Sequence, residues 1–251
     1  MTDSTLSNRR IHVVGATRGL GRGIAAALAE GGASVLAIGR STEALAELRE
    51  ATGVDTRAGD ASSATFVSNV FDDDPPDGVV IVAGARPALG PLSSYDWESF
   101  SAPWETDVKV AFHWLQHSLR RPWPTGRHVV VFSSAAARAG SPLSGGYAGA
   151  KQTQRFMCKY ATGEARAREL PLNVQCVMPL LSPETGLGAA AVRAYAQKAG
   201  EDEGEFLRKR FGETPLSPEI AGREITRLMG DPVMHSVPEF LLMGEGLRAL
   251  L

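Results

Sequence analysis

Tyr147 and Lys151 are the two residues whose types and spacing point most directly to chemistry. They lie four residues apart in "GYAGAKQ", a spacing that places both side chains on one face of a helix. An ammonium group beside a phenol favours the tyrosinate and so lowers the phenol pKa. Ser134 ends the apolar run "HVVVFSS", where its hydroxyl could donate a hydrogen bond to a substrate oxygen. We therefore expect Tyr147 to exchange a proton with an oxygen atom of a bound substrate.

A second motif is the glycine turn "VVGATRGLGRG" (13–23), which joins an apolar strand to a helix. In a doubly wound fold, this first turn is where the pyrophosphate of a dinucleotide binds. Gly15 would permit the tight turn, and Gly19 and Gly21 would let the phosphates approach the backbone. The N–H groups at the helix start would then face the anion.

The residues after the second apolar run, "SVLAI", bear on the choice of cofactor. A carboxylate there usually holds the ribose 2′-hydroxyl of NAD, whereas an arginine suits the 2′-phosphate of NADP. This chain has Gly39, Arg40 and Ser41 at that place, and Arg18 projects from the glycine turn toward the same region. Guanidinium groups can hold a phosphate bidentately, so we expect NADP(H) rather than NAD(H). The alternative is that both are ordinary surface arginines.

The elements that position these residues alternate between strand and helix. We expect strands at 10–16, 34–39, 78–84, 128–134, 172–178 and 239–244, and helices at 20–32, 42–51, 104–119 and 146–170. This alternation predicts a single-domain α/β Rossmann fold over 1–251: a doubly wound parallel β-sheet with helices on both faces. "DDDPPD" (72–77) is expected to be a solvated loop, and 182–213 a mobile lid over the substrate pocket.

Composition narrows the classes of function. The formal net charge of −2 gives no reason to expect nucleic acid or an anionic membrane as partner. No apolar run approaches the roughly 18 residues of a membrane span, and the start lacks the apolar core of a signal peptide. The two cysteines show no metal or redox spacing, which indicates a reducing cytoplasm. His113 and His117 share a helix face, but without HExxH or an acidic cluster we expect packing and no metal.

These motifs occur in an order that resembles the classical short-chain dehydrogenase/reductase family over essentially the whole chain. The glycine spacing GxxxGxG, "AGARPALGPL" (83–92), "VFSSAAARAG…YAGAK" with Ser134, Tyr147 and Lys151, "NVQCVMP" (173–179) and "EIAGREITRLMGDP" (219–232) carry the resemblance. Several motifs in order are far more specific than a single one.

The resemblance implies a set of site residues. The catalytic ones are Ser134, Tyr147, Lys151 and Asp107, and Lys151 would also hold the nicotinamide ribose. The cofactor-binding ones are Gly15, Thr17, Arg18, Gly19, Leu20, Gly21, Arg40, Ser41, Asp60, Ala61, Ala83, Gly84, Tyr147, Lys151, Pro179 and Leu181. The family also implies a small carbonyl or alcohol substrate, Arg86 and Arg138 near the mouth of the site, and a homodimer or homotetramer formed through the helices at 104–119 and 146–170.

The chain departs from the family pattern at several positions. Asn-Asn-Ala-Gly becomes 81–84 "IVAG", Pro-Gly becomes Pro179-Leu180, and Asp-Gly-Gly becomes 244–246 "GEG". The asparagine of the catalytic tetrad is Asp107, whose main-chain carbonyl would hold the water that links Lys151 to solvent. Asp107 either couples to this relay or points away and pairs with a neighbour. These departures keep two alternatives open: an NADP-binding sensor or scaffold with little catalysis, and reduction of an imine or enone.

Overall fold

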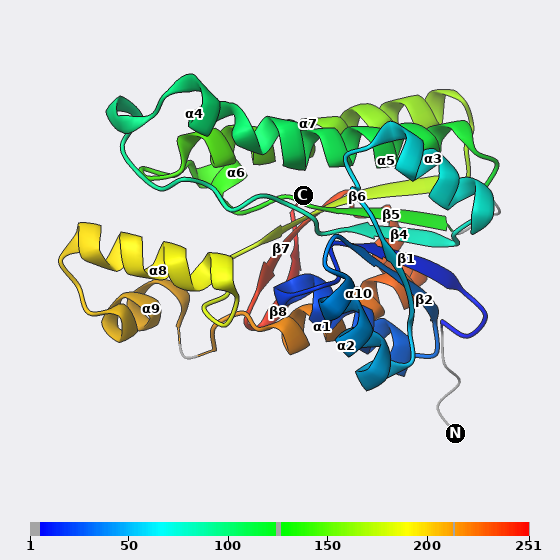
Figure 1. The fold of residues 1–251 in the computed structure, drawn as a ribbon, viewed down its shortest axis with the longest axis horizontal. Coiled ribbons are helices and arrows are strands. Elements are labelled where there is room, and N and C mark those ends of the chain that lie inside the picture. The colour runs from blue at the N-terminus through cyan, green and yellow to red at the C-terminus, as the bar shows by residue number, and fades with distance from the viewer. Residues whose placement is uncertain (1–5, 124–126, 213, 251) are drawn as a thin grey trace.

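The protein is one twisted β-sheet between two layers of helices (Figure 1). The computed structural model describes residues 6–123, 127–212 and 214–250. The strands are β1 (Arg10–Val14), β2 (Ser34–Gly39), β3 (Asp55–Ala58), β4 (Gly78–Ile81), β5 (Arg127–Phe132), β6 (Leu172–Pro179), β7 (Glu239–Met243) and β8 (Gly246–Ala249). The α-helices are α1 (Gly19–Glu30), α2 (Thr42–Thr52), α3 (Ala64–Asp73), α4 (Trp97–Pro103), α5 (Lys109–Arg120), α6 (Ala136–Ala139), α7 (Gly145–Ala167), α8 (Gly186–Ala199), α9 (Glu203–Phe211) and α10 (Pro218–Gly230).

The strand order is β3-β2-β1-β4-β5-β6-β7-β8, and every neighbouring pair is parallel except β7 and β8. The register between the first pairs sets Val13 of β1 opposite Ala37 of β2 and Val80 of β4. The order reverses between β1 and β4, and ligands of such sheets bind at the carboxyl ends of the strands beside this reversal. The predicted doubly wound fold is therefore confirmed.

Each face of the sheet is covered by its own group of helices. Helices α1, α2 and α10 lie on one face, and α3, α5 and α7 on the other (Figure 1). Successive strand residues point to opposite faces, so Val13 belongs to the α1–α10 core and Val14 to the α3–α5–α7 core. Burial on both faces explains why the central strands are continuous apolar runs.

Several elements, including β3, β8, α3, α4 and α6, were not expected from the sequence, and other elements are shorter than expected. The strand β3 and the edge strand β8 are too short and polar for a hydrophobic pattern to reveal them, and α3 was also missed. β4 ends at Ile81, not at residue 84, because the chain leaves the sheet there to line a cleft. The helix expected at 104–119 begins as one π-helical turn, η2 (Trp104–Val108), before α5.

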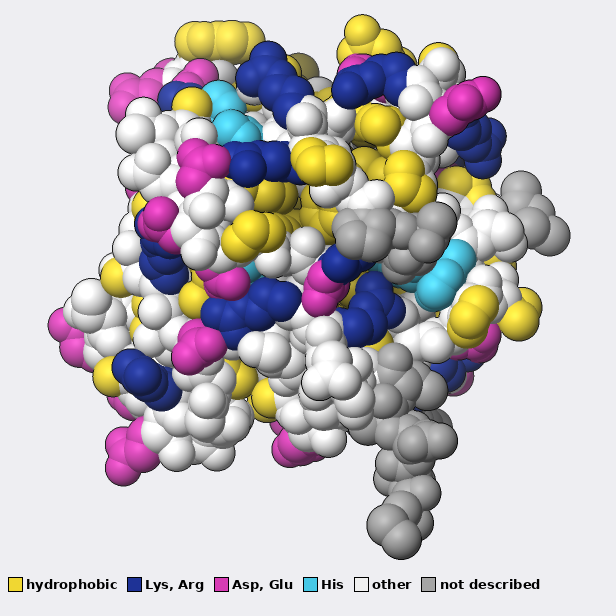
Figure 2. Space-filling model, turned by 90° about the vertical axis from the view of Figure 1, so that its right-hand side faces the viewer, with side chains coloured by type: hydrophobic (Ala, Val, Ile, Leu, Met, Phe, Trp, Pro, Cys, Tyr) yellow, Lys and Arg dark blue, Asp and Glu magenta, His cyan; other side chains and the backbone are white. Residues whose placement is uncertain are grey.

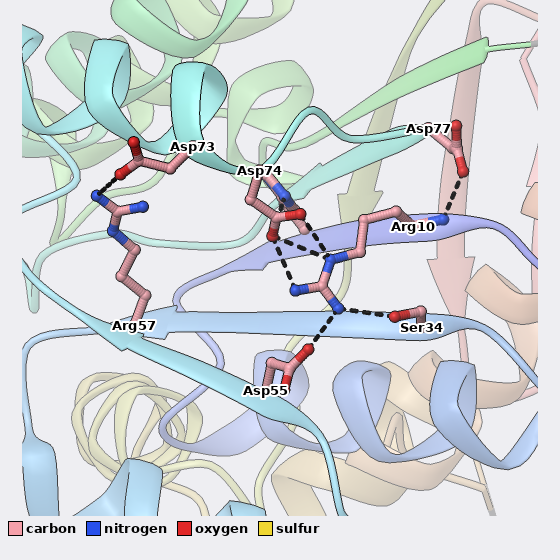
Figure 3. Close-up of polar contacts among 8 residues, drawn as sticks. Arg10, Ser34, Asp55, Arg57, Asp73, Asp74 and Asp77 are labelled. Carbon is pink, nitrogen blue, oxygen red and sulfur yellow. Dashed lines mark hydrogen bonds and ion pairs between the residues drawn. The ribbon is translucent and has the colours of Figure 1, made fainter.

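The acidic run 72–77 is only in part the solvated loop that the sequence suggested: Asp72 and Asp73 end α3 and are exposed, whereas Asp74 and Asp77 in the loop ahead of β4 are half-buried and hydrogen-bonded. Arg10 donates to Asp74 through Nε and Nη2, at 3.0 and 2.8 Å, and its backbone N–H donates to Asp77 at 2.6 Å (Figure 3). Its Nη1 also donates to Asp55 and Ser34, both at 2.7 Å. These contacts hold the N-terminal ends of β1, β2, β3 and β4 together. Hydrogen bonds from His12 and Arg10 lower the pKa of Asp74.

The surface at the N-terminal ends of the parallel strands lies on the side of the molecule opposite α8 and α9. Figure 2 shows basic and acidic side chains interspersed there, without division into two charged halves. At the other end, α8 and α9 form a small core of their own from Val192, Ala196 and Phe206, and they project beyond the sheet (Figure 1). The helical pattern expected within 182–213 is therefore present as two packed helices.

Candidate active site

A cavity of about 1050 Å³ opens at the carboxyl ends of the parallel strands. Its walls come from the turn after β1, the segments that follow β2, β4, β5 and β6, the start of α7, and the α8–α9 pair. This is the position at which a sheet of this topology binds a ligand.

The glycine turn forms one wall, and two of its positions, Gly15 and Gly21, have no room for a side chain. Gly15 has φ +93°, and a Cβ on it would lie 2.6 Å from the backbone nitrogen of Ala83. A Cβ on Gly21 would lie 2.1 Å from the carbonyl oxygen of Gly15. The first turn of α1 holds no acidic residue, so its N–H groups face the cavity without a competing negative charge. This cradle fits the pyrophosphate of a dinucleotide.

The rim beside this turn is basic. Arg18 and Arg40 both line the cavity, and among the described residues neither forms an ion pair. A Cβ on Gly39 would lie 2.4 Å from Cγ2 of Thr17, so an acidic side chain at Gly39 would require Thr17 to move. Asp60 lies near Arg40, and its pKa is lowered chiefly by hydrogen bonds from Ser62, with a contribution from Arg40.

Ser134, Tyr147 and Lys151 meet on the wall facing the glycine turn. Ser134 follows β5, and its hydroxyl contacts Tyr147, which lies in the first turn of α7. The Nζ of Lys151 lies 5.5 Å from the centre of the Tyr147 ring. Lys151 lowers the Tyr147 pKa, as expected from the pair spacing, but burial raises it more and the Asp107 carboxylate adds to that effect, so the net shift of the Tyr147 pKa is upward.

Lys151 is almost completely buried, and other groups hold its ammonium. Asp107 Oδ2 lies 3.0 Å from Nζ, and Nζ donates at 3.0 Å to both Phe132 O and Gln154 Oε1. Gln154 Nε2 donates at 2.7 Å to the main-chain carbonyl of Asp107. The Lys151 pKa is raised: burial lowers it, but Asp107 and Tyr147 outweigh that effect. Asp107 therefore faces the site and pairs with Lys151 itself, and the carbonyl expected to hold a relay water accepts from Gln154.

The structure brings nearly all of the sequence-predicted site residues to this one cavity. Its lining includes Gly15, Thr17, Arg18, Gly19, Leu20, Gly21, Arg40, Asp60, Ala61, Ala83, Gly84, Asp107, Ser134, Tyr147, Lys151, Pro179 and Leu181.

Three groups singled out by sequence lie elsewhere. Ser41 is absent from the lining and instead caps α2 by accepting from the Ala44 N–H at 3.2 Å. Arg138 is also absent from the lining, whereas Arg86 is part of it. His117 stacks on Phe71, with ring centres 5.7 Å apart. Among the residues described, no group of three or more His, Cys, Asp or Glu side chains could hold a metal ion.

Sequence reasoning missed Gln154 and the residues that α8 and α9 contribute. Gln154 lies three residues after Lys151 and seven after Tyr147, so all three share one helix face. That spacing was a usable signal, because a glutamine on a buried face must find hydrogen-bond partners. Tyr195, Phe206 and Arg210 also line the cavity, but no local motif marks them.

Comparison with known proteins gives a consistent result. Residues 15–209 match the family model described as enoyl-(acyl carrier protein) reductase. A 3β-hydroxysteroid dehydrogenase of Mediterraneibacter gnavus is 26% identical over 212 residues, which cover 78% of this chain and 76% of that protein. An uncharacterised short-chain type dehydrogenase/reductase of Sinorhizobium fredii is 29% identical over 140 residues, 55% of this chain and 56% of that protein.

Solved structures share the fold. A short chain dehydrogenase from Salmonella enterica serovar Typhi superposes with a TM-score of 0.76 at 23% identity, covering 95% of this chain and 97% of that chain. A variant of actinorhodin polyketide ketoreductase with NADPH gives 0.77 at 23% identity, covering 97% and 98%. A related structure from Shigella flexneri, complexed with NADP, gives 0.76 at 23% identity, covering 96% and 98%.

Proposed function

The chain belongs to the short-chain dehydrogenase/reductase family, and we propose that this oxidoreductase transfers hydride between NADP(H) and a carbonyl or alcohol substrate. The observation that carries the proposal is the convergence of Ser134, Tyr147 and Lys151 on the same cavity as the glycine turn. The hydroxysteroid dehydrogenase and the ketoreductase among the relatives are named for reactions of this class.

The cofactor would lie along the cavity from the basic rim to Tyr147. Gly15, Gly19 and Gly21 would leave room for its pyrophosphate, and Arg18 and Arg40 would hold the 2′-phosphate. Support for NADP(H) over NAD(H) comes from Arg18 and Arg40, which form no ion pair with any described residue, and from Gly39, where an acidic side chain would require Thr17 to move. NADPH and NADP in two solved relatives are consistent with this preference.

The nicotinamide, when bound, supplies or accepts the hydride. Tyr147 donates its phenolic proton to the substrate oxygen as the carbonyl is reduced, and the tyrosinate left behind is reprotonated from water in the open cavity. Ser134 donates a hydrogen bond to the same oxygen and so stabilises the negative charge that develops on it. Lys151 provides positive charge beside the phenol, moderated by Asp107. In the oxidative direction these proton movements reverse.

Two structural features support proposals about assembly and access. Phe156 and Tyr160 of α7 stack with ring centres 6.1 Å apart and are 63% and 70% exposed, and Phe112 of α5 is 47% exposed. An apolar group of this kind on neighbouring helices favours a homodimer or homotetramer formed through α5 and α7. The α8–α9 pair, which lines the cavity, serves as the lid that controls entry of substrate.

The test is a turnover assay with NADPH against separate panels of ketones and aldehydes, enones, and imines. Reduction of ketones or aldehydes supports the proposal, and turnover confined to enones or imines assigns the alternative reaction. NADPH binding without turnover of any panel favours a sensor or scaffold. The enone panel is a necessary part of the assay because the matching family model is described as an enoyl-(acyl carrier protein) reductase.

A further inference from the structure

Groups of the protein surround the ammonium of Lys151. It donates hydrogen bonds to Phe132 O and Gln154 Oε1, each at 3.0 Å. It also forms an ion pair with Asp107 Oδ2, which lies 3.0 Å from Nζ. Asp107 and Gln154 are fully buried and Lys151 is 4% exposed, so water does not compete for these contacts.

Asp107 is fixed in the orientation that makes this contact. Its Oδ1 accepts from the Ala85 N–H at 2.7 Å and from the Thr106 hydroxyl at 3.0 Å, which leaves Oδ2 directed at the lysine. Its main-chain carbonyl accepts from Gln154 Nε2 at 2.7 Å. Gln154 therefore holds the ammonium with one end of its amide and the Asp107 backbone with the other.

The pairing of Lys151 with Asp107 changes the electrostatic potential at the Tyr147 hydroxyl. A lone ammonium would stabilise the tyrosinate, but a carboxylate 3.0 Å from that ammonium opposes this effect. The hydroxyl of Ser134 also lowers the Tyr147 pKa, and Tyr195 raises it. Loss of solvent around the half-buried Tyr147 raises the pKa most, so the net effect favours the phenol.

We propose that Gln154 is a positioning residue that holds Asp107 against Lys151, and that this neutralised pair keeps Tyr147 a phenol and biases the site toward reduction. In reduction, the O–H bond of Tyr147 breaks and the substrate oxygen gains the proton, while the hydride comes from the reduced nicotinamide. In oxidation, Tyr147 must lose its proton to solvent before it can accept one from the alcohol. The inference rests on the proposed proton-donor role of Tyr147.

The experiment titrates Tyr147 in the cofactor-free protein by tyrosinate absorbance, with the Tyr147→Phe variant subtracted to isolate its signal. We expect Tyr147 to titrate above the ordinary phenol pKa of about 10. In Asp107→Asn its midpoint should fall by about one pH unit, equivalent to a tenfold change in acidity. Gln154→Met should also lower the midpoint of the Tyr147 titration. Gln152→Met, on an exposed position of the same helix, should leave it unchanged.

The second readout is the pH dependence of turnover in both directions. In Asp107→Asn and Gln154→Met, the alkaline decline of reduction and the rise of oxidation should both move to lower pH. A wild-type Tyr147 that titrates at or below an ordinary phenol overturns the inference, and this measurement does not depend on a variant that folds. Identical titrations in wild type and both variants also overturn it. Because the titration requires neither substrate nor cofactor, it is independent of whether Tyr147→Phe abolishes turnover, which tests the proposed function.

Discussion

The hydroxyl of Tyr195 on α8 makes a short contact with the hydroxyl of Ser141, in the segment that leads into α7. It also lies 3.3 Å from the Ser144 hydroxyl, immediately before the helix that carries Tyr147. The side chain of Tyr195 thus links the α8–α9 pair to the opposite wall of the cavity. Because α8 and α9 pack mainly on each other, this contact restrains their movement.

Replacement of Tyr195 by Phe should loosen the α8–α9 pair. Loss of a hydrogen bond costs about 1 kcal/mol, which corresponds to an opening equilibrium about fivefold more favourable. Limited proteolysis should therefore cut within α8 and α9 about fivefold faster, since cleavage follows the open population when opening is rapid. Tyr160→Phe, which removes an exposed hydroxyl on α7, is the control. Equal cleavage rates in all three proteins would show that the contact does not restrain the lid.

Arg40→Asp should reverse or flatten the cofactor preference. The change removes a cation from the rim and adds a carboxylate that repels a phosphate, so NADPH affinity should fall by about 10- to 100-fold. NADH affinity should change little. Fluorescence titration of both cofactors measures this, with Arg49→Asp as a control that makes the same charge change on the exposed side of α2. Equal affinities of the wild-type protein for NADPH and NADH would contradict the assignment.

Tyr147→Phe should remove turnover while leaving the cofactor in place. The variant keeps the ring and deletes the proton donor, an effect typically worth about 10²- to 10⁴-fold in rate. NADPH affinity should stay within about twofold of wild type, because the ring still fills the same space. Steady-state rates and a binding titration are measured together, with Tyr160→Phe as the control. Retention of most activity would exclude Tyr147 as the acid.

The sequence identified the proposed catalytic residues better than it identified their neighbours. Tyr147, Lys151 and the glycine turn are local patterns, with spacing set by one helix or one turn, and the structure places all of them at the cavity. The pair spacing predicted the lowering of the Tyr147 pKa by Lys151, but the net shift also depends on burial and on Asp107, which lies 40 residues away in sequence, so the spacing alone could not give its direction.

The acidic run 72–77 was predicted only in part for a similar reason. A cluster of aspartates before a strand is usually solvated, and nothing local shows that Arg10 would reach Asp74 across the sheet (Figure 3). Long-range partners of this kind follow from the strand order, which hydrophobic patterns do not give. The strands β3 and β8 were missed because each has only four residues and a mixed pattern of burial.

Assembly through α7 predicts that Phe156→Ser will weaken the oligomer. The side chain is 63% exposed in the single chain and stacks on Tyr160, so an interface there would lose an aromatic anchor. Light scattering at micromolar concentration should give a dimer or tetramer for wild type and a smaller mass for the variant. Val233→Ser, which removes an 81% exposed side chain between α10 and β7, should leave the mass unchanged. A wild-type monomer at this concentration would rule the assembly out.

The buried His128, which packs against the half-buried His235, predicts how stability depends on pH. Their rings meet at right angles with centres 3.7 Å apart, and among the described residues neither ring nitrogen of His128 has a hydrogen-bond partner. Burial lowers the pKa of His128 to about 3, with further lowering by His235 and Arg9. The unfolded chain, with a histidine pKa of about 6.5, therefore binds a proton that the folded protein does not over the range between these values.

Stability should therefore be complete above about pH 6.5 and fall as the pH decreases toward 3, because the unfolded state gains the proton. The slope from this one group is about 1.4 kcal/mol per pH unit. Asp74, whose pKa is lowered by His12 and Arg10, contributes only at more acidic pH, below its unfolded value of about 3.9.

Urea unfolding between pH 8 and 4.5 thus separates the histidine contribution. In His128→Leu the decline over this range should be shallower, with a constant offset at pH 8 from altered packing. Parallel curves for wild type and variant would show that His128 is already protonated, or accessible to water, in the folded protein.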